Sequence, residues 1–165
     1  MGILSGNPKT EPMHYGEVFG AWSYLTVAKG GVASHQVMMN HVGDHELQRL
    51  IDEAIKVSEN EIDQIETILR ENGIGLPPTP PARPVAKLEE IPAGARFQDM
   101  EVCAGVQAAI AASLVSCSQI IGQSVREDIA LLFGQFHMEK ARLGAKFLNL
   151  SKDKGWLVPP PLHQD

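Results

Sequence analysis

The segment Ile74-Gly75-Leu76-Pro77-Pro78-Thr79-Pro80-Pro81-Ala82-Arg83-Pro84 decides how the rest of this chain folds. Its many prolines exclude a helix and favour a stiff, extended, polyproline-like backbone. At roughly 3 Å per residue, the stretch from residue 74 to residue 94 can span about 40 Å or more. A helix of about 26 residues is about 39 Å long. The segment is therefore long enough to run the whole length of a helical bundle.

Helical patterns lie on both sides of this crossover. Apolar residues recur at helical spacing in two segments before it and two after it. Gly43 reads as a helix stop followed by Asp44 as an N-cap, and Asn72-Gly73 reads as a second stop. The expected helices cover residues 13–42, 45–72, 99–123 and 125–154, with the crossover at 73–98 and a proline-rich tail at 155–165. We therefore predict one all-α domain over 1–165, a ferritin-like four-helix bundle made of two antiparallel hairpins joined by a long crossover.

Two helices have features that the general pattern does not explain. In the first, an apolar stripe through Val18, Trp22 and Leu25 is interrupted by Gly30-Gly31. These glycines either weaken the helix by roughly 1 kcal/mol each or allow a neighbouring helix to approach closely. In the fourth, residues 129–138 are apolar almost all round, which predicts a second buried face and hence a homodimer interface.

A short internal repeat supports a duplicated hairpin. The first hairpin ends Gly73-Ile74-Gly75-Leu76-Pro77-Pro78, and the second ends Gly155-Trp156-Leu157-Val158-Pro159-Pro160. Both read as a helix, a glycine stop, apolar residues and a double proline. We expect the apolar residues of both copies to pack against an end of the bundle.

Composition narrows the possible partners and location. The 165 residues carry a formal net charge of -6 and no basic run, so the chain lacks the electrostatic footprint of a protein that binds nucleic acid or anionic lipid. The first twelve residues lack the apolar core of a secretory signal, and no apolar run approaches the length of a membrane span. These features predict a cytoplasmic protein that contacts neither nucleic acid nor membrane.

The ligand pattern of ferritin-like di-iron proteins is missing. Those proteins place a Glu on each of two helices and Glu-x-x-His on each of the other two. In this chain the only Glu followed three residues later by His is Glu11, which precedes the first expected helix, and the third helix offers only Glu101. Other combinations of imidazole and carboxylate suit iron, manganese or zinc. The candidate metal ligands are His14, Glu17, Glu61 and His137.

Polar residues also occupy core levels in the middle of the bundle. Glu139 and Lys140 on the fourth helix and Ser58 on the second stand where apolar residues are expected. With Glu61 and His137 they predict a polar layer across the bundle. That layer is either a network of hydrogen bonds and ion pairs that fixes helix register or part of a metal site. A small-molecule site between the helices is a third alternative, for which the small residues of the third helix leave little room.

Five segments resemble a known family over essentially the whole chain. They are Glu11-Pro12-Met13-His14-Tyr15-Gly16-Glu17, Gly73-Ile74-Gly75-Leu76-Pro77-Pro78, Ile91-Pro92-Ala93-Gly94-Ala95-Arg96-Phe97, Gly134-Gln135-Phe136-His137 and Gly155-Trp156-Leu157-Val158-Pro159-Pro160-Pro161. Together they resemble an uncharacterised ferritin-like family of spore-forming bacilli, whose members are labelled spore coat proteins by similarity to spore coat protein F. The resemblance implies the four-helix fold and a bacillus-type source, and it supplies no activity.

These observations favour a non-enzymatic structural or interaction protein. It is expected to be associated with the spore coat, sporulation or stress, to work as a homodimer, and to contact other coat or stress proteins. No nucleophile elbow, phosphate loop or dinucleotide fingerprint is present. The alternative is a metal-binding bundle with a storage or redox role that holds iron, manganese or zinc.

Overall fold

The computed structural model describes residues 11–163, and within them it contains four long helices and no strand. This confirms the predicted all-helical class. The expectation that the first twelve residues carry no signal falls mostly on residues 1–10, which lie outside the described part. The elements are α1 (Tyr15–Met39), α2 (His45–Glu71), the short 3₁₀ helices η1 (Leu88–Glu90) and η2 (Ala93–Ala95), α3 (Asp99–Gln123) and α4 (Glu127–Asp153).

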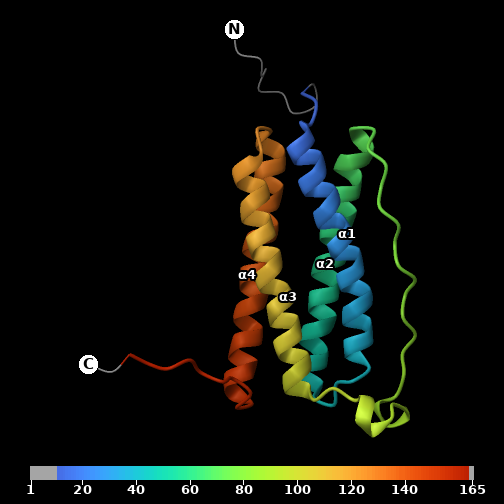
Figure 1. The fold of residues 1–165 in the computed structure, drawn as a ribbon, viewed down its shortest axis with the longest axis vertical. Helices are drawn as coiled ribbons and strands as arrows, with labels where there is room; N and C mark the ends of the chain where they lie inside the picture. The colour runs from blue at the N-terminus through green and yellow to red at the C-terminus, as the bar shows by residue number, and fades with distance from the viewer. Residues whose placement is uncertain (1–10, 164–165) are drawn as a thin grey trace.

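The four helices lie side by side in one bundle (Figure 1). Helices α1 and α2 form one antiparallel hairpin and α3 and α4 form another, while the chain between α2 and α3 returns along the outside of the first hairpin. Because of this return, α2 and α3 run in the same direction. The two hairpins are matched in length, since α1 and α3 each have 25 residues and α2 and α4 each have 27.

The helix ends follow the local sequence. Asp44 is the predicted N-cap of α2, and its carboxylate accepts hydrogen bonds from the amides of Glu46 and Leu47. Gly73 and Gly155 end the two hairpins with φ values of 71° and 68°, a backbone region that favours glycine. In both places the next residue returns a hydrogen bond into the last turn, from the amide of Ile74 to Leu69 O at 2.9 Å and from that of Trp156 to Ser151 O at 2.8 Å.

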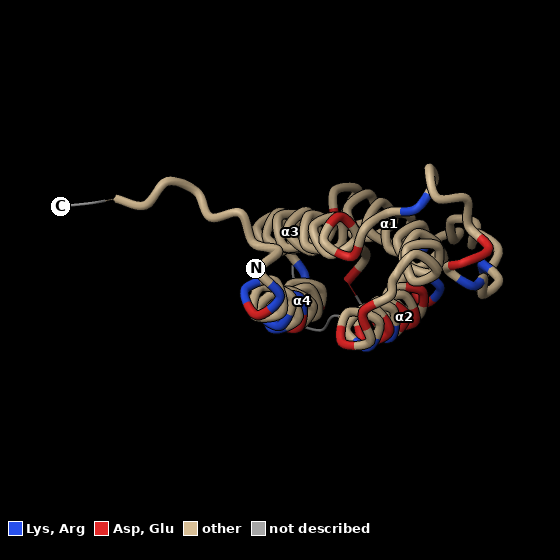
Figure 2. Tube along the Cα trace, turned by 90° about the horizontal axis from the view of Figure 1, so that it is seen from below, with Lys and Arg blue, Asp and Glu red and all other residues tan. Residues whose placement is uncertain are grey.

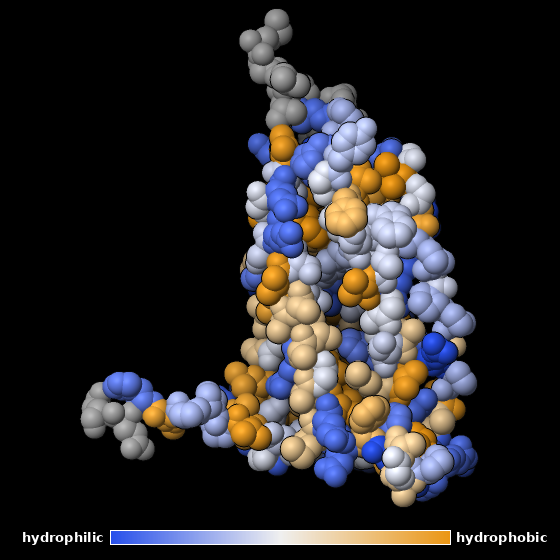
Figure 3. Space-filling view, viewed as in Figure 1, coloured by the Kyte–Doolittle hydropathy of each residue, from blue (hydrophilic) through white to orange (hydrophobic). Residues whose placement is uncertain are grey.

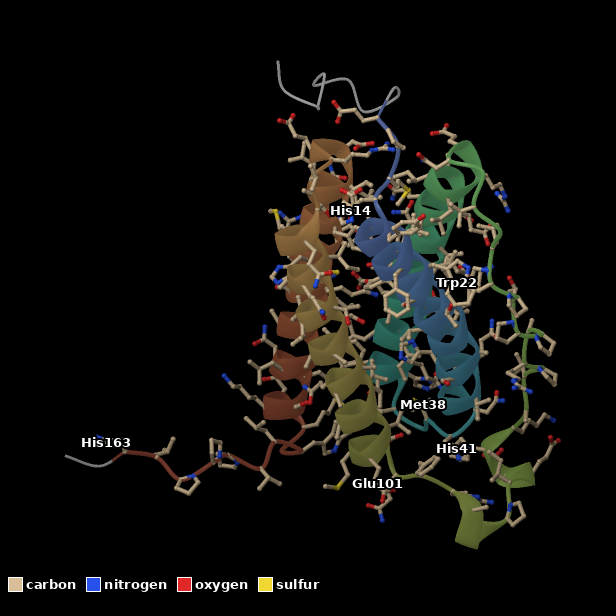
Figure 4. The ribbon with its side chains drawn as sticks, turned by 45° about the horizontal axis from the view of Figure 1, so that its top comes forward. His14, Trp22, Met38, His41, Glu101 and His163 are labelled. Carbon is tan, nitrogen blue, oxygen red and sulfur yellow. The ribbon has the colours of Figure 1, made fainter. Side chains whose placement is uncertain are left out.

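Side chains of α1 hold the crossover against the bundle. Trp22 Nε1 donates to the carbonyl of Gly75, and Lys29 Nζ donates to that of Pro77, each at 2.9 Å. Figure 4 shows Trp22 on the side of α1 that faces the crossover. Further along, the side chains of Gln36 and Asn40 bond to crossover backbone at residues 83–86. The proline-rich backbone cannot form a sheet or helix of its own, so these side chains supply its partners.

The core follows a strict alternation of three- and four-residue steps on α4. Its buried positions include Ile129, Phe133, Phe136, Lys140, Leu143, Phe147 and Leu150. The same spacing on α2 buries Leu47, Ile51, Ala54, Ser58, Glu61, Ile65 and Leu69, with one four-residue step in place of a three. Each helix therefore carries a polar residue in a position that faces the core.

The buried face of α1 is displaced by about one residue from the apolar face predicted through Val18, Trp22 and Leu25. The structure buries Glu17, Ala21, Tyr24, Leu25, Lys29, Ala33 and His35, whereas Trp22 is 36% exposed. Helix α1 has only two charged residues, Glu17 and Lys29, and the structure buries both. The sequence therefore gives no solvated face against which an apolar face can be recognised.

Charge is distributed unevenly between the helices. Figure 2 shows acidic and basic residues concentrated on α2 and α4, whereas α1 and α3 are largely free of them. The segment Ala93–Gln123 is correspondingly apolar, and only 28% of its most apolar 18-residue stretch is buried. That is apolar enough to cross a membrane by length and composition, contrary to the sequence expectation. Figure 3 looks onto this face and shows small and apolar side chains along the middle of α3.

Candidate functional site

A polar cluster lies inside the bundle, on three of its four helices. Helix α1 supplies Tyr24 and His35, α2 supplies Ser58 and Glu61, and α4 supplies Lys140. All five side chains are more than nine-tenths buried. Buried polar groups require partners, so the contacts within this cluster determine what it can do.

The carboxylate of Glu61 is the centre of the cluster and is fully buried. Its Oε2 atom accepts a hydrogen bond from the hydroxyl of Tyr24 and lies 3.1 Å from the ammonium of Lys140. Lys140 also donates to the hydroxyl of Ser58 at 3.1 Å. The other carboxylate oxygen, Oε1, has no hydrogen-bond partner among the described residues. Of the two carboxylate oxygens, Oε2 therefore has hydrogen-bond partners and Oε1 has none.

Burial dominates the acid–base behaviour of these groups. It raises the pKa of Glu61 above its usual value, even though Lys140 and the Tyr24 hydroxyl oppose the shift. Burial, together with the charge of Glu61, also raises the pKa of Tyr24, so the phenol remains a hydrogen-bond donor. Burial and the nearby Lys140 charge lower the pKa of His35, which keeps its imidazole neutral. Its Nδ1 atom is the second buried polar atom of the described residues that lacks a partner.

The cluster lies at the floor of a cleft between α1 and α3. The cleft has a volume of about 290 Å³, and Tyr24, His35, Ser58, Glu61 and Lys140 all line it. The small residues of α3 were expected to leave little room for a cavity. That expectation is wrong, because alanines and serines of α3 line the cleft and do not fill the space beside α1.

Two members of the predicted polar layer lie outside the cluster. His137 and Glu139 are only partly buried, and neither forms a hydrogen bond or ion pair within residues 11–163. Ser58, Glu61 and Lys140 are in the layer as predicted. Sequence reasoning did not include Tyr24 or His35 in this layer. Their signal was the regular spacing of Glu17, Ala21, Tyr24, Ala28, Gly31 and His35, which matches the steps of α2 and α4.

His14 and Glu17 form a separate structure where α1 begins. The carboxylate of Glu17 is 2% exposed, and its Oε1 accepts hydrogen bonds from the amides of Val125 and Arg126, both at 2.8 Å. Its Oε2 accepts from the amide of His14. Glu17 thus satisfies free amides before the first turn of α4 and ties α1 to the α3–α4 connection.

Both ring nitrogens of His14 are also engaged. Nδ1 accepts a hydrogen bond from the amide of Gly16 at 2.9 Å, so the proton of the neutral ring lies on Nε2. Nε2 is 3.1 Å from the carbonyl of Gln123, to which it donates. Figure 4 shows His14 at the end of the bundle where α1 starts. His14 caps its helix and has no lone pair left for a metal in this arrangement.

The structure therefore does not bring the four predicted metal ligands together at one place. His14 and Glu17 lie together at one helix end, Glu61 is paired with Lys140, and His137 makes no polar contact within the described residues. Within residues 11–163, no three His, Cys, Asp or Glu side chains are grouped in a way that could hold a metal ion.

Comparison with known proteins places this chain among proteins of bacilli. An "uncharacterized protein YvdQ" of Bacillus subtilis (strain 168) is 58% identical over 163 residues, which cover 99% of this chain and 96% of the relative. A crystal structure from Bacillus halodurans C-125, described as that of a "putative spore coat protein", is 55% identical with a TM-score of 0.95, and the match covers 96% of this chain and 100% of that one. The resemblance drawn from the sequence is thereby confirmed. Over residues 1–165 the sequence matches one protein family, and the chain belongs to that family, described as protein of unknown function (DUF3231).

Proposed function

We propose that this protein is a structural component of the bacillus spore that works by assembling with further copies of itself, without catalysing a reaction. The description of the Bacillus halodurans relative supports the association with the spore coat. The buried cluster supports a role without catalysis, because its Lys–Glu pair is internally neutralised and no activated nucleophile accompanies it. The long return between the hairpins supports a bundle of the ferritin-like type.

The C-terminal arm is the observation that carries the proposed assembly. After Gly73, the first copy of the repeated motif lies against α1, where Pro77 is buried. After Gly155, the second copy begins with the same backbone geometry but then leaves the bundle (Figure 1). Val158 is 82% exposed and Leu162 is 78% exposed. Trp156 still packs against the core, but beyond it the second segment is exposed where the corresponding part of the first is packed.

The outer face of α3 and α4 is the surface that the arm of a second copy would cover. The corresponding face of the first hairpin is covered by the crossover, whereas Val115, Leu131 and Met138 are exposed by 69%, 68% and 57%. The arm points away from its own bundle, so it is placed to reach a neighbour (Figure 1). Exchange of arms between two copies would bury apolar groups of both, which is a low-cost route to a homodimer. Of the predicted second face of α4, only this outer part remains exposed, because Ile129, Phe133 and Phe136 lie in the core.

Removal of the arm tests this proposal. We expect the intact protein to be a dimer or larger in sedimentation equilibrium, and a chain ending at Trp156 to be a monomer with unchanged helical circular dichroism. The triple change Leu157→Ser, Val158→Ser and Leu162→Ser should have the same effect. Val85→Ser is the matched control, because Val85 is an equally exposed apolar residue of the other proline-rich segment. A monomeric intact protein, or an oligomer that survives truncation, contradicts the proposed assembly.

Association with the spore requires a separate measurement. A fluorescent fusion expressed in sporulating Bacillus subtilis should collect on the forming spore and be recovered with extracted coat protein. The truncated chain should remain diffuse in the mother cell if assembly is what retains it. Recovery of the intact chain only from the mother-cell cytoplasm would overturn the assignment to the spore.

A further inference from the structure

The cleft between α1 and α3 has the properties of a binding site for a small amphipathic molecule. Its walls are largely apolar and uncharged and include Phe19, Val27, Ala109, Ile110 and Ile120. Its volume of about 290 Å³ lies close to the lower limit of roughly 300 Å³ for small-molecule pockets. Its charged groups, Glu61 and Lys140, are both buried, and the polar residues of its walls are uncharged serines and glutamines. The site thus combines an apolar channel with a few convergent polar atoms.

Two polar atoms at the floor have no partner. Glu61 Oε1 and His35 Nδ1 are the only buried side-chain nitrogen or oxygen atoms of residues 11–163 without a hydrogen bond. Both residues line the same cleft. A buried acceptor without a partner is destabilising, and more so when it is charged. A ligand that supplies a donor to Glu61 Oε1 would therefore gain more than the burial of its apolar body alone.

Charge balance determines which donor fits. Glu61 and Lys140 already neutralise each other, with 3.1 Å between Oε2 and Nζ. A ligand ammonium would place a second cation beside Lys140, and a ligand carboxylate would meet Glu61 Oε1, which is itself an acceptor. A hydroxyl is neutral and donates one hydrogen bond, so it can satisfy the carboxylate without adding a charge to the cluster.

We propose that the α1–α3 cleft binds a neutral amphipathic alcohol, with its apolar body between the helices and its hydroxyl donating to Glu61 Oε1. Tyr24 and Lys140 hold the carboxylate in place through Oε2 and leave Oε1 directed at the ligand. The site is internal to one bundle and goes beyond the proposed assembly. It is present whether or not the arms are exchanged.

Two adjacent glycines allow a matched test of the location. A Cβ atom at Gly30 or at Gly31 would meet nothing within 4 Å, so both positions accept a side chain. Gly31 lines the cleft and Gly30 does not. We expect titration calorimetry with 1-octanol to show one site per chain in the intact protein and in Gly30→Leu, and no binding in Gly31→Leu. Retained binding in Gly31→Leu would place the alcohol elsewhere and overturn the proposal.

The chemistry of the head group is tested with probes that share one apolar body. In the intact protein, 1-octanol should bind at least about tenfold more tightly than octylammonium or octanoate, the ratio that about 1.4 kcal/mol of hydrogen bonding gives. Glu61→Gln should reduce this preference for the alcohol. If that variant does not fold, the comparison of Gly30→Leu with Gly31→Leu still tests whether the alcohol binds in the cleft. Equal affinity for all three probes would show partition into an apolar cleft only. Absence of octanol binding would show that the cleft holds only water, and either result overturns the proposal.

Discussion

At the scale of single residues, the ion pair between Glu61 and Lys140 is a buried charge pair whose disruption is expected to be costly. Both side chains are nearly free of solvent contact, and each depends on the other for compensation of its charge. A buried pair is weakly stabilising compared with apolar residues of the same shape, but loss of one partner is costly. The pair therefore explains why two charged residues persist at core positions of α2 and α4.

Lys140→Met should destabilise the fold by about 3–5 kcal/mol, because it leaves the carboxylate of Glu61 buried without a cation. The double variant Lys140→Met with Glu61→Gln should recover most of that loss, since no charge then remains in the cluster. Both free energies of unfolding are measurable by urea denaturation. Lys146→Met is the control on the same helix, because Lys146 pairs with Glu53 at the surface and its loss should cost less than about 1 kcal/mol. Equal losses in the two single variants would contradict the assigned role of the cluster.

The carboxyl group of Glu66 is expected to make the free energy of unfolding fall as the pH becomes acidic. Its hydrogen bond and ion pair with the buried Lys29 lower the pKa of the carboxyl below its usual value. The folded state therefore holds this proton less strongly than the unfolded state, so the contribution to stability is present above the unfolded pKa, near 4.5, and is lost as pH falls through the folded pKa. The difference in unfolding free energy between the intact protein and Glu66→Gln should be largest near neutral pH and shrink below about pH 4.5. A difference that stays constant or grows in acid would exclude this carboxyl as the source.

Several of these residues could be identified from sequence, and others could not. Glu61 and Lys140 were recognisable because they interrupt clear apolar patterns on α2 and α4. Tyr24 and Lys29 were missed because α1 has no charged outer face to set its phase. Glu17 was expected in a metal site, whereas it caps backbone amides that are 108 and 109 residues away in sequence. A contact of that range depends on how the hairpins are placed together, which local patterns do not contain.

At the scale of elements, side chains of α1 hold the proline-rich part of the crossover, and the later part forms hydrogen bonds of its own in η1 and η2. Its extended backbone was predictable from sequence, because proline restricts the backbone directly. Its attachment was not, since Trp22 was assigned to the core and Lys29 had no assigned role. The structure uses both to bind backbone carbonyls of the crossover. The segment is thus an ordered part of the first hairpin and not a free linker.

Lys29→Met should loosen the crossover while the helices remain folded. The change removes the hydrogen bond to Pro77 O, and it leaves Glu66 paired with Arg70. Cleavage by a lysine-specific protease after Lys87, in the exposed part of the crossover, should be faster by about tenfold, which corresponds to about 1.4 kcal/mol of local stability. Lys56→Met is the control, because Lys56 forms an exposed pair with Asp52 on the surface of α2. Unchanged cleavage in Lys29→Met would show that other contacts hold the segment.

At the scale of the whole molecule, two hairpins of matched length differ in what covers them. The crossover covers the first, and the second has an exposed outer face and a projecting arm. The repeat of Gly73 and Gly155 was visible in the sequence, and the structure shows that both glycines adopt the same conformation. The prediction that the apolar residues of both copies pack against the bundle holds for Ile74, Leu76 and Trp156 and fails for Val158, which is exposed. Sequence similarity between two segments does not by itself specify what each of them packs against.

The positions of the candidate metal ligands in the whole molecule also predict how much metal it retains. Protein prepared without a histidine tag and incubated with iron, manganese or zinc should retain well below one ion per chain after desalting. The reason is that His14 and Glu17 are occupied by backbone groups and Glu61 by Lys140, so binding would require breaking several hydrogen bonds for each ligand gained. Elemental analysis of the intact protein and of His137→Ala measures this directly. Retention of one ion per chain that is abolished by His137→Ala or Glu61→Ala would show that the bundle rearranges around a metal, and the storage or redox alternative would then replace the structural one.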